Sequence, residues 1–263
     1  MSLALGPHLL DALVTGELLA DGGAVFGAVP REEWSRWQPP LEGTNTIRLV
    51  HRSLLVRTGQ RVIVVGAGGE VARFEAELAR LGLRRGDVTD VVLARLTSDH
   101  ASALVENGAL TFPAATHHVQ RRHWTWAHHP SELDQARFSP ATLEALESSG
   151  RLHFIEGETE LFAGVSVLVS EGHTVAQQLL RVADEPRWLT YAGALLPTGA
   201  HLEPAWLSAL DLYPLTTVEE KELIVAEALD DDGILFFEHD PFVAACRLRE
   251  EEGALVAAEV ELS

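Results

Sequence analysis

Short apolar runs rich in β-branched residues recur along the chain and predict strands. The runs at 47–57 and 61–65 surround a turn that contains Gly59, which predicts a hairpin. The run at 91–95 predicts a buried strand that ends near Arg95. Further strands are expected at 152–155, 165–169, 178–182, 188–191 and 234–237, and in two terminal runs on either side of 249–253.

Helical patterns are fewer than strand patterns. Apolar residues recur at helical spacing over 71–81, and an N-cap serine followed by proline begins a helix over 139–150. The capping box of Thr217 and Glu220 predicts a last helix that ends near Gly233. Many strands between a few helices predict two sheets with helices outside.

Residues 1–45 are interrupted by glycine and proline and contain few strand-like runs. They predict an opening strand at 18–20 and then a long loop that carries Trp34 and Trp37. The middle of the chain is rich in histidine. Because neighbouring side chains point in different directions on a strand or a helix, neither His117-His118 nor His128-His129 can chelate one ion. We interpret them as surface and packing residues.

Composition narrows the class of protein. The 263 residues, 46% of them hydrophobic, suffice for one α/β domain, and no repeat or linker divides them, so we expect a single domain over 1–263. The net charge of −19 repels nucleic acid and anionic membranes, so we expect neither as a partner. Cys246 is the only cysteine and no signal-peptide pattern is present, which favours the cytoplasm. The oligomeric state stays open, a homo-oligomer included.

The polar residues after the 91–95 strand are the first candidate for chemistry. Arg95, Thr97, Asp99 and His100 follow the strand directly, and loops at strand ends often carry function because the scaffold holds them. Asp99 and His100 pair a carboxylate oxygen with an imidazole nitrogen, which are metal-ligand types.

This segment resembles the signature loop T-H-x-H-x-D-H of the metallo-β-lactamase superfamily. Ala94 stands at the Thr, Arg95 and Thr97 at the first two His, and Asp99 and His100 at the last Asp-His pair. Other stretches are similar to successive landmarks of small hydrolases of this superfamily: D-G-G-A-V-F-G-A-V-P, R-S-L-L-V-R-T-G, F-P-A-A, E-G-H-T, Y-A-G-A-L-L-P-T-G-A-H-L and F-F-E-H-D-P. The resemblance implies a four-layer αββα sandwich of two central mixed sheets, with helices on both outer faces and a metal site along one edge.

The resemblance also implies a dinuclear metal site, and this sequence lacks much of it. His173 matches a downstream ligand of the first metal and His239 the late ligand of the second. The bridging Asp is replaced by Ala194, a supporting Asp by Gly66, and a second His of the G-H-T turn by Gln177. We therefore expect no two-metal cluster.

The two metal positions are affected unequally. The first keeps only His173, and the guanidinium of Arg95 would repel a cation there. The second keeps Asp99, His100 and His239, and three protein ligands with a water are an adequate catalytic set.

Two hypotheses follow. In the first, the chain is catalytically reduced or inactive and keeps a cleft for a small molecule, an anionic one if Arg95 holds its carboxylate or phosphate. In the second, one divalent ion, expected to be zinc, is held by Asp99, His100 and His239 and activates water toward an ester or lactone. His173 or Asp240 would then be the base, and Arg95 would stabilise the oxyanion.

Structural roles remain open beside both hypotheses. Asp99 can cap the following helix, and His100, His173 and His239 can be core histidines with satisfied hydrogen bonds. Arg95 either pairs with Asp99 or points into the cleft toward an anion. We favour the pair, because a buried guanidinium without a partner is costly.

Overall fold

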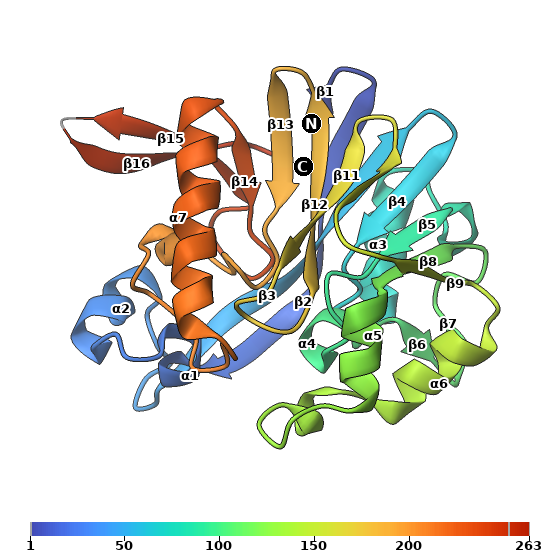
Figure 1. The fold of residues 1–263 in the computed structure, drawn as a ribbon, viewed down its shortest axis with the longest axis horizontal. Helices are drawn as coiled ribbons and strands as arrows, with labels where there is room; N and C mark the ends of the chain where they lie inside the picture. The colour runs from blue at the N-terminus through green and yellow to red at the C-terminus, as the bar shows by residue number, and fades with distance from the viewer. Residues whose placement is uncertain (1, 252, 263) are drawn as a thin grey trace.

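The computed structural model describes residues 2–251 and 253–262. Two seven-stranded sheets make up the centre (Figure 1). The first has the order β1-β2-β3-β4-β5-β8-β9, with bounds Leu3–Leu5, His8–Asp21, Thr46–Thr58, Arg61–Val65, Asp90–Val92, Thr116–Gln120 and Leu152–Ile155. The second runs β10 to β16 in chain order, with bounds Thr159–Phe162, Val165–Ser170, Gln177–Asp184, Arg187–Tyr191, Ile234–Phe236, Ala245–Glu251 and Ala254–Glu259. A small hairpin pairs β6 (Val105–Glu106) with β7 (Ala109–Leu110).

Helices cover the outer faces of both sheets. They are α1 (Gly22–Phe26), α2 (Arg31–Trp37), α3 (Val71–Arg80), α4 (Ser98–Ala101), α5 (Arg121–His128), α6 (Pro140–Ser148) and α7 (Pro214–Asp230), with 3-10 turns at Arg85–Asp87, Gln135–Arg137 and Gly199–Leu202. None of the described helices is long and apolar enough to span a membrane.

Three buried clusters define the layers. One joins α3, α5 and α6 to the outer face of the first sheet, a second fills the space between the sheets, and a third joins α7 to the outer face of the second. Alternate side chains of a strand point to opposite faces, so each sheet contributes to two clusters. The expected four-layer αββα sandwich is thus confirmed.

Two local expectations were wrong. Residues 1–45 are not strand-poor, because β2 is 14 residues long and pairs along its length with β3, and α1 and α2 occupy the expected loop. The capping box also fails: α7 begins at Pro214, and the Glu220 carboxylate accepts hydrogen bonds from Ser170 and from the backbone N–H groups of 171 and 172. Tertiary contacts therefore use residues whose sequence pattern suggests a local role.

The histidines of β8, expected as surface and packing residues, are both buried, so the surface position is wrong for this pair. His117 is 0% exposed and His118 is 5% exposed. Neither ring nitrogen of His117 has a hydrogen-bond partner. Burial lowers the pKa of His117 to about 4, so the folded protein keeps this ring neutral at pH 5.

We expect His117→Leu to stabilise the protein more at pH 5 than at pH 8. The unfolded ring takes up a proton near its ordinary pKa of 6.5, while the folded ring does not, so His117 lowers stability as pH falls below that value. The gain at pH 5 relative to pH 8 should be about 1–2 kcal/mol, measured by denaturant unfolding at both pH values. His129→Leu, at an exposed position, is the control and should give no such difference.

Candidate functional site

Side chains from separate segments meet beyond the ends of β5 and β14. We call this cluster the polar centre; its members are Arg95, Asp99, His100, Arg137, His173, Glu238 and His239. The structure brings together all four residues that the sequence placed at a common site, namely Asp99, His100, His173 and His239, through the contacts that follow.

Arg95 lies at the middle of the polar centre and is completely buried. Its Nη1 donates to Oε2 of Glu238 over 2.8 Å, and its Nε donates to Oδ2 of Asp99 over 3.2 Å. Nη2 also contacts Asp99 and lies 3.3 Å from Nε2 of His239. Arg95 therefore pairs with Asp99, as favoured from the sequence, and a second carboxylate completes its environment.

His100 and His239 both use their ring nitrogens within the protein. The backbone N–H of Ala94 donates to Nε2 of His100 over 3.0 Å, so its ring proton sits on Nδ1 and is donated to Glu238 over 2.8 Å. His239 donates from Nδ1 to the carbonyl of Val50 over 2.9 Å, which leaves Nε2 facing Arg95. Neither histidine has a free lone pair.

His173 contacts a second guanidinium. Nη2 of Arg137 donates to its Nε2 over 3.0 Å, and its Nδ1 donates to Oδ1 of Asp211 over 2.7 Å. Arg137 also lies 3.7 Å from Oδ1 of Asp99. Asp99 therefore lies between two guanidiniums, one on each carboxylate oxygen.

The charges of the polar centre stabilise one another. Burial disfavours ionisation of Asp99 and Glu238, but Arg95 outweighs it and holds the pKa of both carboxyls well below the ordinary range. Burial lowers the pKa of both His100 and His173, which favours their neutral forms. Burial also opposes charge on His239, yet the Glu238 and Asp99 carboxylates raise its pKa.

Three solved structures with the same architecture are described as hydrolases. A probable metal-dependent hydrolase from Staphylococcus aureus shares 24% identity at a TM-score of 0.87, covering 99% of this chain and 100% of that one. AidC, a dizinc quorum-quenching lactonase in complex with a product, shares 18% sequence identity at a TM-score of 0.81, and the match covers 100% of this chain and 98% of that one. The hydrolase AbOPH of the beta-lactamase superfamily shares 17% sequence identity at a TM-score of 0.84, and the match covers 100% of this chain and 97% of that one.

The chain has the metallo-β-lactamase fold. No protein-family model and no curated protein matches the sequence. At this level of identity the structural similarity establishes the fold, and the chemistry has to be argued from the residues of this chain.

The replaced positions of the metallo-β-lactamase fold have other local roles. Gly66 has φ of +81°, and a Cβ there would lie 3.0 Å from both the His100 ring and the Tyr191 hydroxyl, so an Asp would not fit without movement. Gln177 accepts a hydrogen bond from the backbone N–H of Ala194 over 3.2 Å. The turn is thus held by a neutral amide in place of charged ligands.

The polar centre does not fit a metal ion. Asp99 is paired with guanidiniums, His100 has no free nitrogen, and His239 faces Arg95. Within 2–251 and 253–262, no three side chains of His, Cys, Asp or Glu are placed to hold an ion together. From the sequence, Arg95 is expected at the first metal position. Its guanidinium instead contacts Asp99 and His239, which match ligands of the second metal. The side chain that contacts His173, the remaining ligand of the first metal, is Arg137.

Sequence reasoning missed three residues of this network. Glu238 stands next to His239 after a buried strand, and that position was a usable signal. Arg137 and Asp211 come from a 3-10 turn and a loop without any recognisable motif. Their roles depend on contacts distant in sequence, 36 and 38 positions from His173.

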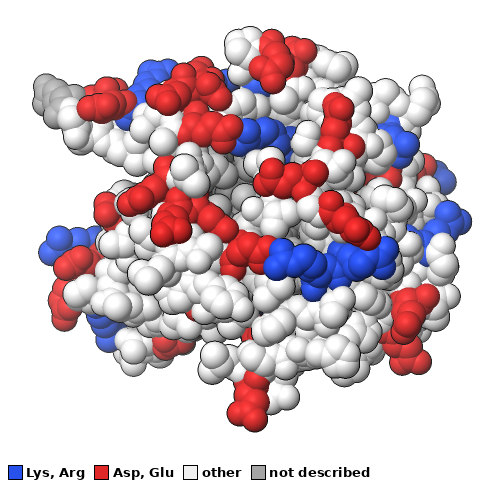
Figure 2. All heavy atoms as spheres, in the orientation of Figure 1, with Lys and Arg blue, Asp and Glu red and all other residues white. Residues whose placement is uncertain are grey.

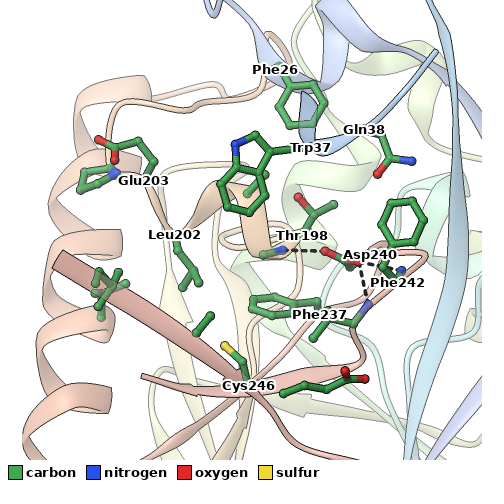
Figure 3. Close-up of a pocket in the computed structure, with 18 of the residues that line it drawn as sticks. Phe26, Trp37, Gln38, Thr198, Leu202, Glu203, Phe237, Asp240, Phe242 and Cys246 are labelled. Carbon is green, nitrogen blue, oxygen red and sulfur yellow. Dashed lines mark hydrogen bonds between the residues drawn. The ribbon is translucent and has the colours of Figure 1, made fainter. Parts of the chain in front are cut away.

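A cavity of about 640 Å³ lies at the loop that follows β14, and among the described residues no member of the polar centre lines it (Figure 3). Its wall includes Asp240, the neighbour of His239, together with Trp37, Phe237 and Phe242. Asp240 accepts hydrogen bonds from three backbone N–H groups, those of 199, 242 and 243. The volume is in the range of small-molecule sites, and most of the lining is apolar.

Proposed function

We propose that this protein is a catalytically reduced relative of the metallo-β-lactamase-fold hydrolases that binds a small molecule and does not carry out metal-dependent hydrolysis at the polar centre. The observation that supports it is the position of Arg95, fully buried between Asp99 and Glu238 with His239 in contact. A guanidinium has donors only and cannot take the place of an ion that activates water.

The candidate bases are also engaged in hydrogen bonds within the protein. Nε2 of His173 accepts from Arg137, and Asp240 accepts from three backbone N–H groups. Arg95 has no exposed surface with which to contact an oxyanion. All three candidate catalytic groups are therefore engaged in holding the structure together.

The cavity at the loop that follows β14 is our candidate for the ligand site. Among the residues that the structure describes, its lining includes Glu203, Asp240 and Glu259 and no lysine or arginine. Figure 2 shows acidic side chains spread over the visible face, in keeping with the net charge of −19. These charges favour a neutral or cationic apolar molecule over the anionic ligand expected from Arg95 alone.

We expect zinc affinity of the natural chain to be unchanged by His239→Ala, because His239 holds no ion in this proposal. Calorimetric titration with zinc at pH 7.5 measures this, with elemental analysis of protein purified without added metal. Ester and lactone hydrolysis should stay at the buffer rate with and without zinc. Loss of a bound ion in His239→Ala, together with zinc-dependent hydrolysis, would contradict the proposal.

The second candidate function is a mononuclear hydrolase that uses Asp99, His100 and His239. What favours it is the similarity to metal-dependent hydrolases, among them a dizinc lactonase. It requires the ion pair between Arg95 and Asp99 to break. It also requires Nε2 of His100 to lose the hydrogen bond that it accepts from the backbone N–H of Ala94. The titration above separates the two candidates directly.

A further inference from the structure

His118 and His153 form a pair that is separate from the polar centre. They are register partners on the parallel strands β8 and β9, and their Nδ1 atoms lie 3.2 Å apart. His118 is almost fully buried and His153 is exposed. The two rings line a cavity of about 480 Å³ between β9 and β10.

Asp90 determines which nitrogen of His118 carries the proton. Its Oδ1 lies 2.8 Å from Nε2 of His118, and its Oδ2 accepts from Thr89 and from Arg61 over 2.7 and 2.9 Å. Burial opposes ionisation of Asp90, but these hydrogen bonds keep its pKa below the ordinary value. The carboxylate therefore accepts a hydrogen bond from Nε2–H of His118, and the lone pair on Nδ1 points at His153.

We propose that Nδ1 of His118 and Nδ1 of His153 bind one divalent transition-metal ion of the zinc type, with Asp90 orienting the first ring. Two nitrogens at 2.0–2.1 Å from a tetrahedral ion are roughly 3.3 Å apart, close to the observed separation. A carboxylate behind a metal-binding imidazole is a common arrangement because it fixes the tautomer and raises ligand basicity.

Binding requires one proton to move. The proton that His153 shares with His118 through Nδ1 is transferred by solvent to the exposed Nε2, so that both Nδ1 lone pairs face the ion. No covalent bond between heavy atoms changes. The remaining coordination positions open on the cavity and are filled by water, because the described side chains offer no third ligand.

The charges around the pair suit a cation. The charged residues that line the cavity are Asp90, Glu156, Glu160 and Arg61. Arg61 is paired with Asp90 and lies over the Phe162 ring, its Cζ 3.7 Å from the centroid. Glu156 is paired with Arg121 over 2.8 Å outside this lining, so the lining itself carries three carboxylates and one guanidinium and is net negative.

The test is calorimetric titration of the whole protein with zinc alone. We expect one ion per chain, affinity reduced at least about tenfold in His153→Ala, and about tenfold in Asp90→Asn, the loss typical of a removed orienting carboxylate. Cobalt should give the visible absorption of a tetrahedral ion, lost in His153→Ala. His129→Ala, at an exposed position, is the control and should bind as the natural chain does.

Two outcomes would overturn the proposal. One is the absence of saturable binding up to about 1 mM zinc. The other is an ion whose affinity is unchanged in His153→Ala but lost in His239→Ala, which would place it at the polar centre. That second result would contradict the proposed function as well, whereas the first leaves it intact. His153 is exposed, so its replacement should leave folding unaffected and the result stays interpretable.

Discussion

Replacing Arg95 with methionine should destabilise the protein by about 3–5 kcal/mol, the usual cost of removing one partner of a buried ion pair. Arg95 is the only group that contacts Asp99, Glu238 and His239 together among the contacts found in 2–251 and 253–262. Without it Glu238, 2% exposed, keeps a buried charge that the His100 proton and the His239 ring, 3.7 Å away, offset only in part. Denaturant unfolding at pH 7.5 measures the loss.

The pH dependence of this loss tests its cause. In the natural chain the pKa of Glu238 is depressed, so its stabilisation is present above the ordinary carboxylate pKa and is lost as pH falls. In Arg95→Met burial raises that pKa, and the protonated carboxyl becomes tolerable at low pH. The difference in the free energy of unfolding between Arg95→Met and the natural chain should therefore become smaller as the pH falls from 7.5 to 4.5.

Two further variants serve as controls. Arg48→Met removes a pair with Glu17 in which both side chains are mostly exposed, and it should cost less than about 1 kcal/mol. Adding Glu238→Gln to Arg95→Met should recover part of the stability, since it neutralises the unpaired charge. A cost for Arg95→Met as small as that of Arg48→Met would show that Arg95 does not hold the polar centre together.

Much of the fold could be predicted because its signals are local or ordered along the chain. The hairpin of β3 and β4, the α3 periodicity and the N-cap of α6 each depend on neighbouring residues, and Ser139 does accept from the backbone N–H of Thr142. The predicted strand at 18–20 lies within β2, but the rest of β2 was missed, because its pairing with β3 depends on residues far along the chain.

The sequence predicted several residues of the polar centre, but it did not predict most of the contacts between them. The motif positions identified Asp99, His100, His173 and His239, and the cost of a buried guanidinium without a partner made the ion pair of Arg95 with Asp99 foreseeable. The contacts of Glu238 and Arg137 were not foreseeable in this way, because they reach the centre from positions 143 and 36 residues away from Arg95 and His173, respectively. Whether a degenerate motif still binds metal therefore depends on partners that the motif does not contain.

The largest gain in metal affinity should come from restoring ligands and removing both guanidiniums. Arg95→His with Thr97→His returns two imidazoles, and Ala194→Asp returns the bridging carboxylate. These three changes leave His173 engaged by Arg137 and His100 engaged by the backbone N–H of Ala94. We expect the triple variant to bind zinc at least about tenfold more tightly than the natural chain, and adding Arg137→Leu to improve it again.

Calorimetric titration should use the His153→Ala background, so that an ion at the second histidine pair does not contribute. Ala194→Asp alone is the matched control, because it adds a carboxylate while Arg95 and Arg137 remain in place, and it should leave zinc affinity unchanged. Equal, tight zinc binding by the control and by the variant that carries all four substitutions would mean that the guanidiniums do not occupy the metal positions. The inactive-site proposal would then be wrong, since its whole basis is that Arg95 and Arg137 engage the side chains an ion would need.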